Sequence, residues 1–134
     1  MGIFIDDMDL MNMAIGVFWT LLFLQSSLDK ILDWGGNLNW LKSHFEKSIL
    51  AGIVPLMLWI LTLMEFIAGI LCAVGVVQVV CTGKTYYLSM GLVASIVSLL
   101  MLFFGQRLAK DYEGARTIAI YFGVALISVM ILSK

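Results

Sequence analysis

The sequence predicts an all-α fold, a bundle of four transmembrane helices with a short amphipathic helix that lies at the membrane interface and connects helices one and two. Three observations predict it. The chain is 62% hydrophobic and 13% charged, whereas a soluble domain uses about 25% charged residues to cover its surface. It contains four apolar stretches of about the length that a helix needs to cross a hydrocarbon core of about 30 Å. These stretches lack the alternation of polar and apolar residues that a membrane-spanning strand shows.

One integral membrane domain over residues 1–134 accommodates these spans, with helices over about 9–34, 48–80, 86–107 and 115–133. The second span is longer than a straight crossing requires, and Pro55 near its start predicts a kink or a first turn at the interface. The third is free of charge over 86–105. The fourth is short, and its flanking residues extend it.

Between the first two spans the sequence predicts a short helix over about 39–47, after a break at Gly35 and Gly36 and with Asn39 as its N-cap. Its apolar and aromatic residues share one face: Trp40, Leu41, His44 and Phe45. This pattern favours a helix that lies in the headgroup layer. A helix outside the membrane that packs on the bundle is the alternative.

Basic residues near the ends of the spans predict the orientation. The loops at 30–47 and 107–116 contain Lys30, Lys42, Lys47, Arg107, Lys110 and Arg116, and the opposite side contains Lys84 and Lys134. The positive-inside rule therefore places both long loops in the cytoplasm and both termini in the periplasm. A net charge of −1 and the lack of a basic cluster with interleaved aromatics argue against nucleic acid as a partner.

Glu65 is the main candidate for chemistry, because it lies deep inside the second span. A carboxylate at that depth costs about 2.5–3.5 kcal/mol, so we expect it to face the interior of the bundle and to have a partner. The polar residues at the cytoplasmic end of the bundle are its candidate neighbours: Gln25, Ser26, Asp29, Lys30 and Arg107.

Lys30 is a better inward candidate than Asp29, since adjacent helical residues point in different directions, although Lys30 is close enough to the interface to snorkel. From the rise per residue, the Cα atoms of Lys30 and Glu65 differ in depth by about 10 Å. We therefore expect Gln25, Ser26 or a water between them. Two interpretations of Glu65 stay open: a proton carrier or polar contact for a bound quinone or lipid headgroup, and a structural hydrogen bond between helices.

Small residues mark the faces along which the helices pack. Gly91, Ser95 and Ser98 form one stripe, and Gly69 follows Glu65 by one turn. Such residues allow close contact between helices in a bilayer. The alternative is that they leave room for a flat ligand.

The sequence gives little support for a metal site or a redox-active disulfide. Cys72 and Cys81 lie on one predicted helix, with Cα atoms about 13 Å apart, too far for a disulfide. His44 is the single histidine, so one chain cannot supply bis-histidine haem ligation. We found no zinc-binding set, nucleophile elbow or phosphate loop, and so predict no metal site and no catalytic residue.

Three segments resemble DoxX-like membrane proteins. "SSLDKIL" is similar to the G-x-x-K-L segment that closes the first helix in that family, with Ser27 at its glycine and Lys30 at its lysine. "LMEFIAGILCAVG" resembles the E-x-x-x-G-x-x-L-x-x-G pattern of the second helix through Glu65, Gly69 and Gly75, with Leu71 one residue off. "GQRLAKDYEGARTIAIYF" resembles the turn from the third helix into the fourth.

The resemblance implies a four-helix bundle in the bacterial inner membrane, in a family loosely tied to quinone-linked oxidoreductases. It draws attention to Glu65 and Lys30. The leading hypothesis is an accessory membrane subunit of a redox or envelope complex, whose polar cluster holds a quinone headgroup, a lipid headgroup or a partner helix. One alternative is a quinone-linked oxidoreductase subunit that uses Glu65 for proton exchange. The other is a purely structural or assembly subunit. Expected partners are the lipid bilayer and other membrane subunits or further copies of the chain.

Overall fold

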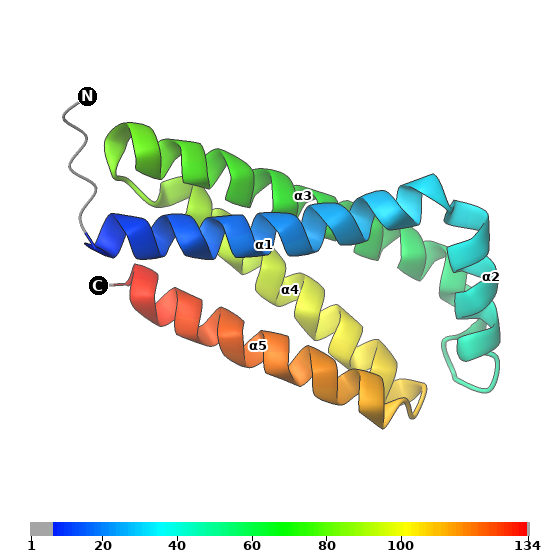
Figure 1. Ribbon diagram of the computed structural model, residues 1–134. Coiled ribbons are helices and arrows are strands. Elements are labelled where there is room, and N and C mark those ends of the chain that lie inside the picture. The colour runs from blue at the N-terminus through cyan, green and yellow to red at the C-terminus, as the bar shows by residue number, and fades with distance from the viewer. Residues whose placement is uncertain (1–6, 134) are drawn as a thin grey trace.

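The computed structural model describes residues 7–133, which form five α-helices and one short 3-10 helix (Figure 1). In chain order they are α1 (Asp7–Leu32), α2 (Trp34–His44), η1 (Ala51–Ile53), α3 (Val54–Thr82), α4 (Tyr86–Leu108) and α5 (Tyr112–Leu132). The described part of the chain contains no strand. The all-α prediction is therefore confirmed.

Four of these elements are long and apolar enough to cross a membrane: α1, η1 together with α3, α4 and α5. Helix α3 carries Pro55 in its first turn, where the missing N–H costs no hydrogen bond. Many large apolar side chains stay exposed along all four, as expected where lipid rather than water surrounds the helices. The chain is a multi-pass membrane protein.

The helices pack in a chain of neighbours, α1 on α3, α3 on α4 and α4 on α5. Helices α1 and α5 touch less, and Figure 1 shows them nearer each other at the end that carries the termini than at the end that carries α2. The Trp19 indole, fully buried, donates to Ser128 Oγ at 3.2 Å and joins α1 to α5. Trp19 also stacks on Phe23 in the core, with ring centroids 5.8 Å apart.

Glycines allow the backbones to approach closely. A Cβ on Gly75 would lie 2.6 Å from the backbone of Leu88, and one on Gly91 would lie 2.9 Å from Cys72 N, so α3 and α4 meet along this line. A Cβ on Gly69 would lie 2.7 Å from Leu24 on α1. Close approach of this kind is how helices associate in lipid.

Ser95 and Ser98 are fully buried in α4. Each donates its hydroxyl to a carbonyl oxygen of its own helix, Ser95 to Gly91 at 2.8 Å and Ser98 to Ala94 at 3.0 Å. Ser95 also has a side-chain hydrogen bond with Cys72 of α3, whereas Ser98 acts at the contact through its small size.

The structure corrects the prediction for the connection between the first two spans. Helix α2 begins at Trp34, not near Asn39, and Gly35 and Gly36 lie inside its first turn. The chain bends instead at Asp33, with φ −130° and ψ 55°. The Asn37 side chain stabilises this bend, because its amide donates to the carbonyl oxygens of Asp33 at 2.8 Å and Asp29 at 3.4 Å, in addition to the backbone N–H that each of these oxygens accepts.

Candidate polar site between the first two membrane spans

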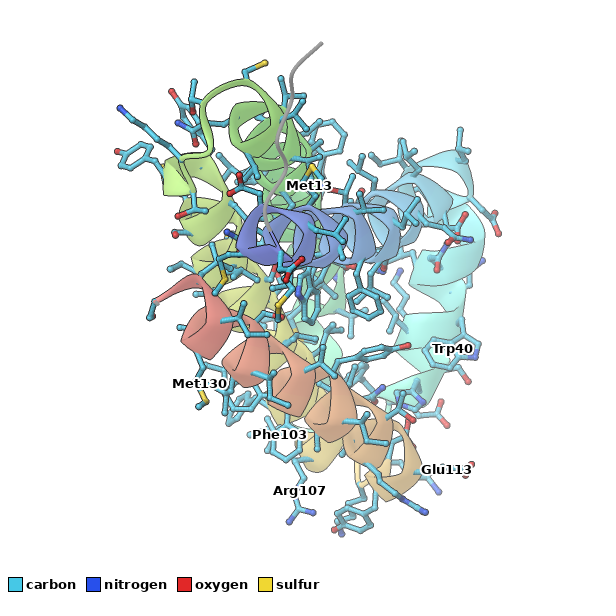
Figure 2. All side chains as sticks on the ribbon, turned by 60° about the vertical axis from the view of Figure 1, so that its left-hand side comes forward. Met13, Trp40, Phe103, Arg107, Glu113 and Met130 are labelled. Carbon is cyan, nitrogen blue, oxygen red and sulfur yellow. The ribbon has the colours of Figure 1, made fainter. Side chains whose placement is uncertain are left out.

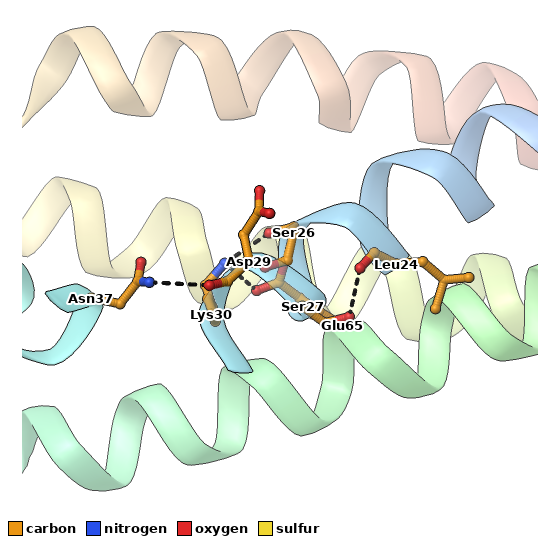
Figure 3. A network of polar contacts seen from close by, with 7 residues as sticks. All are labelled: Leu24, Ser26, Ser27, Asp29, Lys30, Asn37 and Glu65. Atoms are coloured by element: carbon orange, nitrogen blue, oxygen red, sulfur yellow. Dashed lines mark hydrogen bonds and ion pairs between the residues drawn. The ribbon is translucent and has the colours of Figure 1, made fainter. Parts of the chain in front are cut away.

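Glu65 and Lys30 form a buried ion pair between α3 and α1 (Figure 3). Lys30 Nζ lies 3.0 Å from Glu65 Oε1, and the side chains are 17% and 1% exposed. The sequence predicted a partner for Glu65 but expected Gln25, Ser26 or a water between it and Lys30. That expectation is wrong, because the two charged groups meet directly.

The direction of helical side chains explains why they meet. Every Cα–Cβ bond in a helix tilts toward the N-terminus. Helices α1 and α3 are antiparallel in Figure 1, so Lys30 leans inward from the end of α1 while Glu65 leans toward that same end. The two tilts together remove much of the separation that the rise per residue predicts.

Ser26 completes the surroundings of the Lys30 ammonium. Lys30 Nζ donates to Ser26 Oγ at 2.7 Å and to the Ser26 carbonyl oxygen at 3.5 Å. The neighbouring Ser27 is fully buried and donates to the Leu24 carbonyl at 3.1 Å. The ammonium is therefore held at a fixed place by one helix while it faces the carboxylate of the other.

The other predicted members of the cluster lie elsewhere. Gln25 and Asp29 are exposed, and Figure 3 shows the Asp29 carboxylate directed away from Glu65. Arg107 is exposed in the last turn of α4, and its guanidinium lies 4.8 Å from the centroid of the Tyr112 ring. It points away from the bundle in Figure 2. The inclusion of Arg107 is wrong, because its position near the end of α4 lets it stack on the turn rather than enter the bundle.

The pair leaves hydrogen-bonding capacity unused on the α3 side. Glu65 Oε1 contacts the Lys30 ammonium at 3.0 Å and has no further hydrogen-bond partner within residues 7–133. Thr62 Oγ1, on the same helix three residues earlier, has no hydrogen-bond partner among these residues. Both residues are buried, and buried polar atoms without partners are uncommon enough to indicate a ligand or water site.

A second polar cluster, which the sequence did not predict, joins α2 to the turn between α4 and α5. His44 Nε2 lies 3.1 Å from Gln106 Oε1 and 3.4 Å from Asp111 Oδ2. Asp111 also caps α5 by accepting from the backbone N–H of Gly114 at 3.0 Å. We call His44, Gln106 and Asp111 the clasp. The amphipathic pattern predicted that His44 shares the apolar face of this helix, but no local signal identified its partners.

The turn between α4 and α5, which carries Asp111, is tight. Lys110 in this turn has φ 61°, a left-handed conformation that costs free energy for a residue with a Cβ.

His44 also contacts an aromatic side chain of its own helix. It is stacked on Trp40, with ring centroids 4.6 Å apart. Trp40 is 59% exposed, so the bundle covers only part of the face that it shares with His44. The described residues contain no group of three or more metal-binding side chains.

Fold and site together define the class: a four-span helical membrane protein with a charged pair buried between its first two spans. Comparison with protein-family models, with curated proteins and with solved structures finds no match. The resemblance to DoxX-like proteins therefore stays a prediction.

Proposed function

We propose that this chain is a small integral membrane subunit of DoxX-like type, in which the Lys30–Glu65 site binds a quinone headgroup, a lipid headgroup or a partner helix. It serves as an accessory part of a redox or envelope complex in the bacterial inner membrane. One observation carries the proposal: inside a membrane span, Glu65 is 1% exposed and its carboxylate lies 3.0 Å from the Lys30 ammonium of the neighbouring helix.

The chemistry of the pair supports a polar ligand. A lysine ammonium has three donors and a carboxylate has only acceptors, so the pair can bond to a carbonyl oxygen and to a hydroxyl of one ligand. Lys30 is the more accessible partner at 17% exposed. A charged pair that only joined helices would gain little over well-packed apolar residues of similar volume.

The test is native mass spectrometry of the full chain, extracted gently from its host membranes. We expect a bound small molecule or a protein partner on the wild type and its loss in Glu65→Gln and in Lys30→Met. Glu113→Gln is the matched control, because Glu113 is an exposed acid in the first turn of α5. A bare chain in all four samples would contradict the proposal and favour a purely structural subunit.

The second candidate is a quinone-linked oxidoreductase subunit in which Glu65 exchanges protons with the bound quinone. The position of Glu65 between α1 and α3 favours it, because a general acid or base must lie within hydrogen-bond reach of the group with which it exchanges a proton. Purified chain that binds quinone but never changes its redox state with any donor would exclude this candidate and leave the accessory role.

A further inference from the structure

An apolar pocket lies beside the ion pair, at the α2 end of the contact between α1 and α3. Its volume is about 450 Å³, and it is open on one side, because several of its lining residues are exposed. The lining combines aromatic, aliphatic and one polar side chain: Ile31, Trp34, Trp59, Thr62, Leu63 and Phe66. Ile31 follows Lys30 directly, and Thr62 precedes Glu65 by three residues, so the pocket and the Lys30–Glu65 site share the same turns of both helices.

The aromatic wall favours a ring over a hydrocarbon chain as the occupant. Lipid tails are as apolar as leucine, so an acyl chain gains little free energy by leaving the bilayer for this pocket. A flat ring gains additional contact energy when it packs on aromatic side chains. Trp34 and Trp59 lie with ring centroids 5.5 Å apart at 59°, and Phe66 follows Trp59 by two turns on the same face of α3.

Thr62 is the polar residue of the pocket lining and can form a hydrogen bond with a ligand. It is 5% exposed, and its Oγ1 has no hydrogen-bond partner within the described residues. Threonine in a helix divides between rotamers, so a rotation about χ1 can turn the hydroxyl toward the pocket. A ligand oxygen that accepts from this hydroxyl removes the cost of an unpaired buried group.

We propose that this pocket binds the ring of a flat, lipid-soluble compound that carries a hydrogen-bonding oxygen, with the ring against Trp59 and the oxygen on Thr62. The inference rests on the proposed function, since it names the ligand class of the adjoining Lys30–Glu65 site. The ligand enters from the bilayer, because the lining residues Leu63, Trp59 and Ile31 are exposed on the lipid-facing surface.

The test uses the full chain in lipid nanodiscs and a benzoquinone with a decyl tail as the probe, with binding followed by quenching of indole fluorescence. We expect saturable quenching that decyl alcohol, which has the tail and an oxygen but no ring, does not reverse. Trp59→Leu weakens binding about tenfold through lost ring contact, and Thr62→Val weakens it about fivefold through the lost hydrogen bond. Trp40→Leu is the matched control, since Trp40 lies on α2 and does not line the pocket, and it leaves the dissociation constant unchanged.

Three results would overturn the inference: no saturable quenching, equal affinity of the Trp59→Leu and Thr62→Val variants with the wild type, or displacement of the probe by decyl alcohol. Glu65→Gln separates the two proposals. If Glu65→Gln loses the native ligand and Trp59→Leu leaves the affinity for the probe unchanged, the Lys30–Glu65 site is supported as the ligand site and the pocket is refuted. Probe binding that needs Trp59 and Thr62 but not Glu65 would uphold the pocket and make the ion pair structural.

Discussion

Within the ion pair, Glu65 depends on Lys30 more than Lys30 depends on Glu65. Glu65 has the Lys30 ammonium 3.0 Å away and is almost fully buried, whereas Lys30 also has Ser26 and a partly exposed side chain. Removal of one member of a buried pair leaves a charge without its counterpart, which costs more than replacement of both. The loss of Lys30 should therefore be more harmful than the loss of the Glu65 charge.

This asymmetry can be measured in a double-mutant cycle. We expect Lys30→Met to lower the free energy of unfolding in detergent by about 3 kcal/mol, and Glu65→Gln by about 0.6–2 kcal/mol. The double variant should lose less than the sum of the two, because neither charge is left behind. Strictly additive losses would show that the two side chains are not coupled.

Gly75 offers a second test at the scale of one residue. An added Cβ would lie 2.6 Å from the Leu88 backbone, so Gly75→Ala should push α3 and α4 apart and lower the free energy of unfolding by about 1–3 kcal/mol. Gly123→Ala is the control, because nothing lies within 4 Å of the Cβ it would add. Alanine should there raise stability by about 0.5–1 kcal/mol through helix propensity. Equal effects at both positions would contradict the close approach at Gly75.

Helix α2 links the two halves of the bundle at the scale of whole elements. It continues almost directly from α1 and reaches the α4–α5 turn through the clasp. Helices α1 and α5 make few contacts with each other. At the end of the bundle that carries α2, the clasp is therefore a main connection between the α1–α2 segment and the α4–α5 turn.

Loss of the clasp should free α2 without unfolding the bundle. In His44→Ala we expect faster hydrogen exchange of the backbone amides over 34–44 and a stability loss of about 1 kcal/mol, since the contacts with Gln106 and Asp111 disappear. Lys42→Ala, an exposed change on the same helix, should leave exchange unaltered. Unchanged exchange in His44→Ala would mean that α2 is held by its contacts with α1 and α3.

At the scale of the whole molecule, the two cysteines report on orientation. Cys81 is exposed near the end of α3 and Cys72 is buried within it. If the termini face the periplasm, a membrane-impermeant maleimide added to intact spheroplasts should label Cys81 and leave Cys72 unlabelled. Lys47→Cys in a Cys81→Ser background should be labelled only after the membrane is opened. The reverse pattern would show that the positive-inside count predicts the wrong orientation.

The sequence by itself determined the all-α membrane class, the four spans and the need of Glu65 for a partner. These follow from hydropathy, helix length and the cost of a charge in lipid, which are properties of local segments. Only the tertiary structure decided that Lys30 meets Glu65 directly, that Arg107 lies outside, that α2 begins at Trp34, and that His44 joins Gln106 and Asp111. These contacts depend on the tilt of side chains, the antiparallel packing of helices and the closing of a turn, because each joins residues whose separation in space is not fixed by their separation in sequence.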